Sequence, residues 1–90
     1  MNFISTEMEK GTPQPTNFCT FYVYARNTHA KRKISAVVEV KVIYGPKPGD
    51  TYTKQATPVV PPAQRQLAWS NTHKCDSTVT SRVVSAKWAN

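Results

Sequence analysis

The side chains best suited to metal chemistry are two cysteines and two histidines: Cys19, His29, His73 and Cys75. Two thiols with two imidazoles form the usual ligand set of a structural zinc site. Cys19 and His29, however, lie at opposite ends of a predicted strand, which at roughly 3.3 Å per residue separates them by about 20 Å. They cannot share an ion unless that strand is broken, so we predict neither a metal site nor a cofactor.

The two cysteines are instead a candidate disulfide. An up-and-down path through the predicted strands places Cys19 and Cys75 at the same end of the domain. Closing a loop of this size would contribute roughly 4 kcal/mol in the chain-entropy model. A reducing cytosol favours the alternative of two small buried thiols. The sequence leaves the redox state of the pair open.

No set of side chains suits acid–base or nucleophilic catalysis. The predicted folded body carries three carboxylates, Glu39, Asp50 and Asp76, which fall in one strand and two different loops. No serine or carboxylate is arranged beside either histidine for proton transfer or nucleophilic attack. The chain also lacks a glycine-rich phosphate loop. We therefore predict no catalytic residues and a protein that is not an enzyme.

Positive charge is the strongest functional signal in the chain. The net charge is +7, and residues 18–90 hold eleven basic and three acidic side chains. Such an excess creates a long-range field that favours acidic partners. The candidate anion-binding or partner-binding cluster is Arg26, Lys31, Arg32 and Lys33, with Lys41, Lys47 and Lys54 as an extension. A solvated connection between strands is the plainer interpretation of this cluster.

A second candidate surface is apolar. Tyr22, Tyr24, Val37 and Ile43 lie on the faces of their strands opposite the predicted core faces. Together they could form a patch of the kind that marks an association surface. The two tyrosines adjoin the basic connection and could also stack on nucleic-acid bases.

These side chains are positioned by a series of predicted strands. Residues 34–44 alternate apolar and polar positions and predict a half-buried strand, and residues 18–25 predict a second one. The polar and basic connection between them favours a hairpin. Residues 51–57 predict an edge strand, and the proline-rich stretch 58–62 is suited to crossing between sheets.

Two further strands are predicted in the last third of the chain. The first contains Arg65, Leu67 and Trp69 and precedes a polar loop at residues 70–77. The second spans residues 79–88, with Val84 on its apolar side and a bulge near residue 83 that brings Val79 inward. No segment has apolar residues at helical spacing over three turns.

Residues 1–17 predict an irregular N-terminal arm, because Gly11, Pro13 and Pro15 interrupt a stretch with no regular period. Residues 18–90 then form a single domain. The class is all-β: a small antiparallel β-sandwich, which at the level of the fold loosely resembles immunoglobulin and fibronectin type III domains, or a partly open barrel.

We expect a non-enzymatic module for protein–protein interaction or structural assembly, which binds a partner or its own copies through an exposed strand face and the arm. Binding of nucleic acid or another polyanion through the basic connection is one alternative. Inhibition of an acidic partner enzyme is another. The sequence shows no secretion signal, which makes the cytoplasm the default location, and no run long enough to span a membrane.

Overall fold

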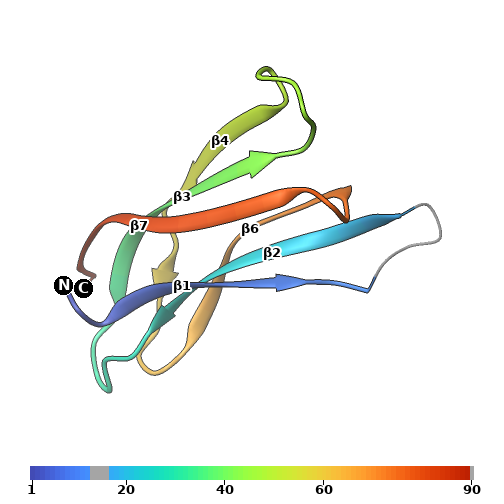
Figure 1. Ribbon diagram of the computed structural model, residues 1–90. Coiled ribbons are helices and arrows are strands. Elements are labelled where there is room, and N and C mark those ends of the chain that lie inside the picture. Colours follow the sequence, from blue (N-terminus) through green and yellow to red (C-terminus); the bar gives the residue numbers. More distant parts are fainter. Residues whose placement is uncertain (13–16, 90) are drawn as a thin grey trace.

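The computed structural model describes residues 1–12 and 17–89, and these residues form seven strands and no helix. The strands are β1 (Ile4–Lys10), β2 (Phe18–Asn27), β3 (Ile34–Ile43), β4 (Thr51–Ala56), β5 (Val59–Val60), β6 (Arg65–Lys74) and β7 (Thr78–Trp88). One sheet has the order β1-β2-β6, and we call it sheet A. In the other, sheet B, β3 pairs with β7 along one edge and with β4 and β5 along the other. All pairings are antiparallel, and the two sheets pack together, which confirms the predicted small β-sandwich (Figure 1).

The core lies between β2 and β3, the central strands of the two sheets. Alternate residues of each strand point inward, as the period of two requires. From β2 the core takes Cys19, Phe21, Val23 and Ala25, and from β3 it takes Ile34, Ala36, Val38, Val40 and Val42, with Val60 and Val79 added from β5 and β7. The predicted alternation of β3 is therefore confirmed, although Tyr44 lies beyond the strand and is 41% exposed.

The predicted hairpin between β2 and β3 does not form, because the two strands belong to different sheets. Each strand carries an apolar face, and these faces can cover each other only when the strands lie face to face. Buried Asn27 closes the connection: its amide donates to the carbonyls of Arg32 (2.7 Å) and Val60 (3.1 Å), and its Oδ1 accepts from the backbone N–H of His29 (2.8 Å). An unpaired buried amide would be costly, so these three bonds fix the crossing.

The N-terminal arm is not irregular throughout, since β1 occupies residues 4–10 and pairs with β2 in the register Ile4↔Asn27 to Lys10↔Phe21. Half-buried Ile4 and Thr6 face inward, whereas Glu7 faces outward beside Tyr24. The edge of β2 offers unpaired backbone groups, and pairing with them satisfies the arm's own donors and acceptors. Pro13 and Pro15 lie outside the described residues.

β7 contains the bulge that the sequence predicts. Val37 pairs with Ser85 and Val38 pairs with Val83, so Val84 is the extra residue. Val79 is consequently buried, with 7% of its surface exposed, as expected. Val84 is expected on the inward face, but it points outward and is 43% exposed. The bulge shifts the side-chain alternation of the strand by one residue at this point.

The β3–β4 hairpin projects beyond the sandwich, and the N-terminus and the end of β7 lie at the opposite end (Figure 1). The tip of the hairpin is closed by two backbone bonds, from Tyr44 N–H to the Asp50 carbonyl (2.9 Å) and from Asp50 N–H to the Lys47 carbonyl (2.9 Å). The molecule is elongated as a result, with extents of 43 × 27 × 16 Å. Its two ends therefore present separate surfaces.

Candidate functional site

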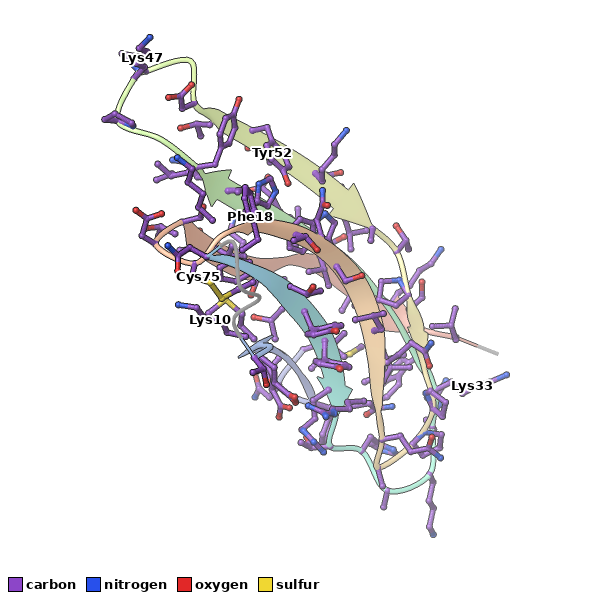
Figure 2. The ribbon with its side chains drawn as sticks, turned by 90° about the vertical axis from the view of Figure 1, so that its right-hand side faces the viewer. Lys10, Phe18, Lys33, Lys47, Tyr52 and Cys75 are labelled. Atoms are coloured by element: carbon purple, nitrogen blue, oxygen red, sulfur yellow. A yellow bond between two sulfur atoms is a disulfide. The ribbon has the colours of Figure 1, made fainter. Side chains whose placement is uncertain are left out.

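The two long sides of the sandwich differ. On one side β1 lies against β7, and the Ser81 hydroxyl is hydrogen-bonded to the Thr6 hydroxyl (2.9 Å). On the other side the edges of β6 and β4 have no strand partner among residues 1–12 and 17–89 (Figure 2). We call this second side the open side.

β6 supplies the longer of these two free edges. Between its terminal cations, Arg65 and Lys74, the strand has no acidic residue, proline or glycine. The N–H of Thr72 donates to the side-chain oxygen of Asn71 (2.8 Å) rather than to β2, so it faces the free edge. Because backbone groups alternate between the two edges of a strand, the N–H of Ser70 faces the same way. The edge is thus equipped to accept another strand.

Several side chains of the open side belong to the core faces of their strands without being buried. On β6, Trp69 and Asn71 stand opposite the core residues Val23 and Phe21 of β2. On β4, Lys54 stands opposite Val40 of β3. Trp69 is half-buried, and Asn71 and Lys54 are exposed. Edge strands leave such positions uncovered, and an additional strand would cover them.

A polar and aromatic cluster links the two sheets at this side. The Tyr52 hydroxyl lies 2.6 Å from Nε2 of His73, and the Asn71 amide donates to the same hydroxyl at 3.5 Å. The ring of Tyr44 is nearly parallel to that of His73, with centroids 5.9 Å apart. Tyr52 comes from β4 and His73 from β6, so the contact fixes the projecting hairpin against sheet A. The predicted polar loop at residues 70–77 is wrong in its first half, because residues 70–74 complete β6.

Ion pairs hold three of the four arginines, Arg26, Arg65 and Arg82, and none of the lysines in the described residues. Glu7 binds Arg26 and Arg65, Glu9 binds Arg65 at 2.8 Å, and Glu39 binds Arg82 at 2.9 Å. Arg26 hydrogen-bonded to Glu7 lowers the pKa of that carboxyl, and Arg82 does the same to the pKa of Glu39. Of the 12 cationic side chains, nine take part in no ion pair within the described part of the chain. They are Arg32 and the lysines Lys10, Lys31, Lys33, Lys41, Lys47, Lys54, Lys74 and Lys87.

The predicted basic cluster is divided by the fold. Lys31, Arg32 and Lys33 lie in the β2–β3 connection at one end of the molecule, and Lys47 lies at the other end, as Figure 2 shows. Arg26 faces outward on sheet A, where Glu7 neutralises it. The predicted extension of the cluster by Lys41, Lys47 and Lys54 is therefore wrong, because the length of β3 separates these lysines from residues 31–33.

A lysine that the sequence analysis omits joins the three basic residues of the connection. Lys87 stands opposite Ser35 at the end of β7, and the N–H of Ala89 donates to the carbonyl of Lys33 at 3.0 Å. We call Lys31, Arg32, Lys33 and Lys87 the basic end. No local sequence signal indicates Lys87, because only the pairing of β7 with β3 brings it there.

The predicted apolar patch is also divided. Tyr22 and Tyr24 face outward from sheet A, whereas Val37 and Ile43 face outward from sheet B, so the two pairs lie on opposite faces of the sandwich. The tyrosine rings are stacked at 6.4 Å, and the guanidinium of Arg65 lies 3.9 Å from the ring centre of Tyr24. The sequence identifies the outward faces correctly but cannot assign the strands to sheets.

The cysteines are joined as Cys19–Cys75, with their Cα atoms 4.9 Å apart. The bond ties the start of β2 to the turn between β6 and β7. His29 and His73 lie at opposite ends of the molecule, and the described residues contain no group of three or more metal-ligating side chains. His73 has Tyr52 and Asn71 as its polar neighbours, and neither provides a carboxylate for proton transfer.

Comparison of the chain with protein-family models, curated proteins and solved structures gives no match. Within the described residues, no helix is long and apolar enough to cross a membrane.

Proposed function

We propose that this protein is a non-enzymatic binding module that takes an extended, acidic segment of a partner protein along the free edge of β6. The single observation that carries the proposal is the ten-residue strand β6, which is paired on one side and free on the other. β6 has a bulge at Ala68, because Val23 pairs with Trp69 and Tyr24 pairs with Leu67. An extended segment that adds to this edge gains backbone hydrogen bonds on the regular stretch from Trp69 to Lys74.

The shape of the sandwich supports this position. Sheet A has three strands and sheet B has four. A fourth strand beside β6 would extend sheet A over the open side and cover Trp69, which is half-buried. Burial of a tryptophan contributes strongly to binding because the ring brings a large apolar area.

Charge supports an acidic partner. Arg65 and Lys74 stand at the two ends of β6, and Lys54 lies on the facing edge strand β4. Neither β6 nor β4 contains an acidic side chain. Carboxylates on the incoming segment would therefore meet the unpaired ammonium groups of Lys74 and Lys54, whereas Arg65 is already held by Glu7 and Glu9.

Charge also argues against a second copy as the occupant. Antiparallel pairing of β6 with β6 of another copy, centred on the strand, would set Arg65 beside Lys74 of that copy, and the symmetry would repeat this contact. Like charges directly opposite each other destabilise a strand pair, although Glu7 and Glu9 of the same copy reduce the repulsion at Arg65. The net charge of +7 on each copy adds a general repulsion.

The arm is predicted to contribute partner contacts, but β1 is less open than β6. One edge of β1 pairs with β2, and the strand also contacts β7. We therefore assign partner binding to β6 and not to residues 4–10. The disulfide Cys19–Cys75 is typical of proteins in oxidising compartments, and we expect the partner there.

The test uses a synthetic peptide of alternating threonine and valine with glutamates at both ends, titrated into the intact protein and followed by backbone amide NMR. We expect the largest shifts at the amides of Ser70 and Thr72. A peptide with lysines in place of the glutamates should bind several times more weakly, at least about fivefold, because the contact with Lys74 changes from attraction to repulsion.

Two substitutions at one position separate edge pairing from side-chain effects. Thr72→Pro removes an N–H that faces the free edge, and we expect it to weaken peptide binding by about tenfold or more, because proline also obstructs the ladder. Thr72→Val keeps the N–H and should bind like the parent. Equal binding by Thr72→Pro, with its fold verified by circular dichroism, would reject pairing along β6.

A further inference from the structure

The basic end combines four cations with no acidic side chain in the described segments that form it. Lys31, Arg32 and Lys33 are consecutive and exposed, and Lys87 is exposed beside them. None of the five acidic side chains of the protein lies in residues 28–35, 57–64 or 86–89, the segments that form this end. The field at this end is therefore positive and uncompensated.

The aromatic rings at this end pack against one another. The rings of Phe3 and His29 are perpendicular at 4.8 Å, and those of His29 and Trp88 lie 5.0 Å apart at 72°. The guanidinium of Arg32 lies 4.4 Å from the ring centre of Trp88. Nδ1 of His29 accepts the backbone N–H groups of Lys31 (3.1 Å) and Arg32 (3.0 Å), which fixes the basic loop over these rings.

Apolar side chains are exposed beside the cations. Phe3 is 39% exposed, and Val59 is 49% exposed in a row with Ser35 and Lys87 on the outer face of sheet B. Cations interspersed with exposed apolar groups are the usual composition of a surface that adsorbs to anionic lipid headgroups. The lysine stems can lie along such an interface while their ammonium groups reach the phosphates.

We propose that the basic end binds the surface of an anionic lipid bilayer. The headgroup phosphates would meet Lys31, Lys33 and Lys87, and Phe3 and Val59 would enter the boundary between headgroups and acyl chains. A nucleic acid is less suited to this end, because the face of Trp88 is occupied by Arg32 and is not free to stack on a base. The proposal does not depend on β6.

The test is co-flotation of the intact protein with vesicles of phosphatidylcholine alone or mixed with phosphatidylglycerol. We expect binding to the mixed vesicles only, with a partition coefficient that falls as salt is raised. The variant Lys31→Gln/Lys33→Gln/Lys87→Gln leaves Arg32 on Trp88. It should lower the partition coefficient by about 100-fold, because each cation near an anionic surface contributes roughly fivefold.

A matched control removes the same charge from the other end. In the control variant Lys41→Gln/Lys47→Gln/Lys54→Gln, the partition coefficient should stay within about threefold of the parent value. Salt screens charges over roughly 10 Å, and the molecule is 43 Å long. This control removes Lys54 from the open side, whereas the basic-end variant leaves that side intact, so the two proposals can fail separately. Equal losses in both triple variants would mean that only net charge matters and would overturn the assignment.

Further measurements test the apolar contribution to lipid binding and the competing possibility of nucleic-acid binding. Val59→Ser should lower binding severalfold without changing its salt dependence. In a Trp69→Phe background the one remaining tryptophan is Trp88, and brominated lipid should quench its fluorescence. Absence of quenching, or binding of an oligonucleotide by the basic end with no binding of mixed vesicles, would reject the lipid proposal.

Discussion

Single residues in this protein divide into cations that stabilise the fold and cations that remain free. Arg26, Arg65 and Arg82 are held by glutamates on the outer faces of the sheets. The planar guanidinium can make several directed bonds to a carboxylate, whereas the lysine ammonium remains strongly hydrated. Every lysine is without an ion pair in the described residues. The free cations are therefore the ones available to partners.

Glu7 gives a pH-dependent prediction at this scale. The hydrogen bond from Arg26 lowers its pKa in the folded state, so the folded protein binds fewer protons at acidic pH than the unfolded chain does. The stabilisation is complete above the ordinary pKa of about 4.5 and is lost as the pH falls through the lowered value. Urea unfolding at a series of pH values should show a free energy of unfolding that decreases on acidification, with a shallower decrease for Glu7→Gln.

Glu39 provides the comparison for this measurement. Its pKa is lowered by Arg82, which donates to it across the β3–β7 pair of sheet B. Because Glu7 lies on sheet A, the effects of Glu7→Gln and Glu39→Gln should add in the double variant. An acid profile for Glu7→Gln identical in slope to that of the parent would contradict the role assigned to the Arg26 bond.

Individual elements are joined by long-range strand pairing, and within the described residues one disulfide adds a covalent link. Cys19 and Cys75 are 56 residues apart in the sequence. Reduction restores the freedom of that loop in the unfolded chain and should lower the free energy of unfolding by about 4 kcal/mol. Denaturant unfolding with and without reductant measures the difference. The double variant Cys19→Ala/Cys75→Ala should be insensitive to reductant, and a parent protein that is equally insensitive would argue against the bond.

Elements with two different faces are predictable from the sequence. In β3, buried Val38 and Val40 alternate with half-buried Glu39 and exposed Lys41, so the period of two is clear. β1 lacks this contrast, because its inward positions include Thr6, and the sequence accordingly predicts an irregular arm. The end of β6 is missed for a related reason: edge strands keep water on one side, so a polar residue such as Asn71 can occupy a core-facing position.

Which strands pair with each other is harder to predict from local sequence patterns. The connection between β2 and β3 has a composition and length suited to a hairpin, yet the strands separate into two sheets. That outcome depends on non-local requirements: both apolar faces must be covered, and Asn27 must find partners in Arg32 and Val60. The composition of the candidate surfaces is equally hard to predict from local patterns, because Lys87 joins the basic end only through the pairing of β7 with β3.

The whole molecule combines an elongated shape with a net charge of +7 and a free strand edge. A free edge normally favours association between copies, and proteins oppose this with charges on the edge strand. In this protein Arg65 and Lys74 occupy the two ends of β6 and would face each other across a symmetric pair. The charges that attract an acidic segment therefore also oppose self-association.

Reversing one of these charges should convert the edge into a self-association site. In Lys74→Glu, centred antiparallel pairing of two β6 strands would set the introduced carboxylate beside Arg65 of the other copy twice. Because Glu7 and Glu9 already pair with Arg65, the exchange of two repulsive contacts for two attractive ones should strengthen dimerisation by about 1 kcal/mol, roughly fivefold. Sedimentation velocity at low salt measures the change, and added salt should reduce it. Lys47→Glu alters the net charge equally at the hairpin tip, away from β6, so equal dimerisation by that variant would show that lower net charge, and not the β6 edge, controls association.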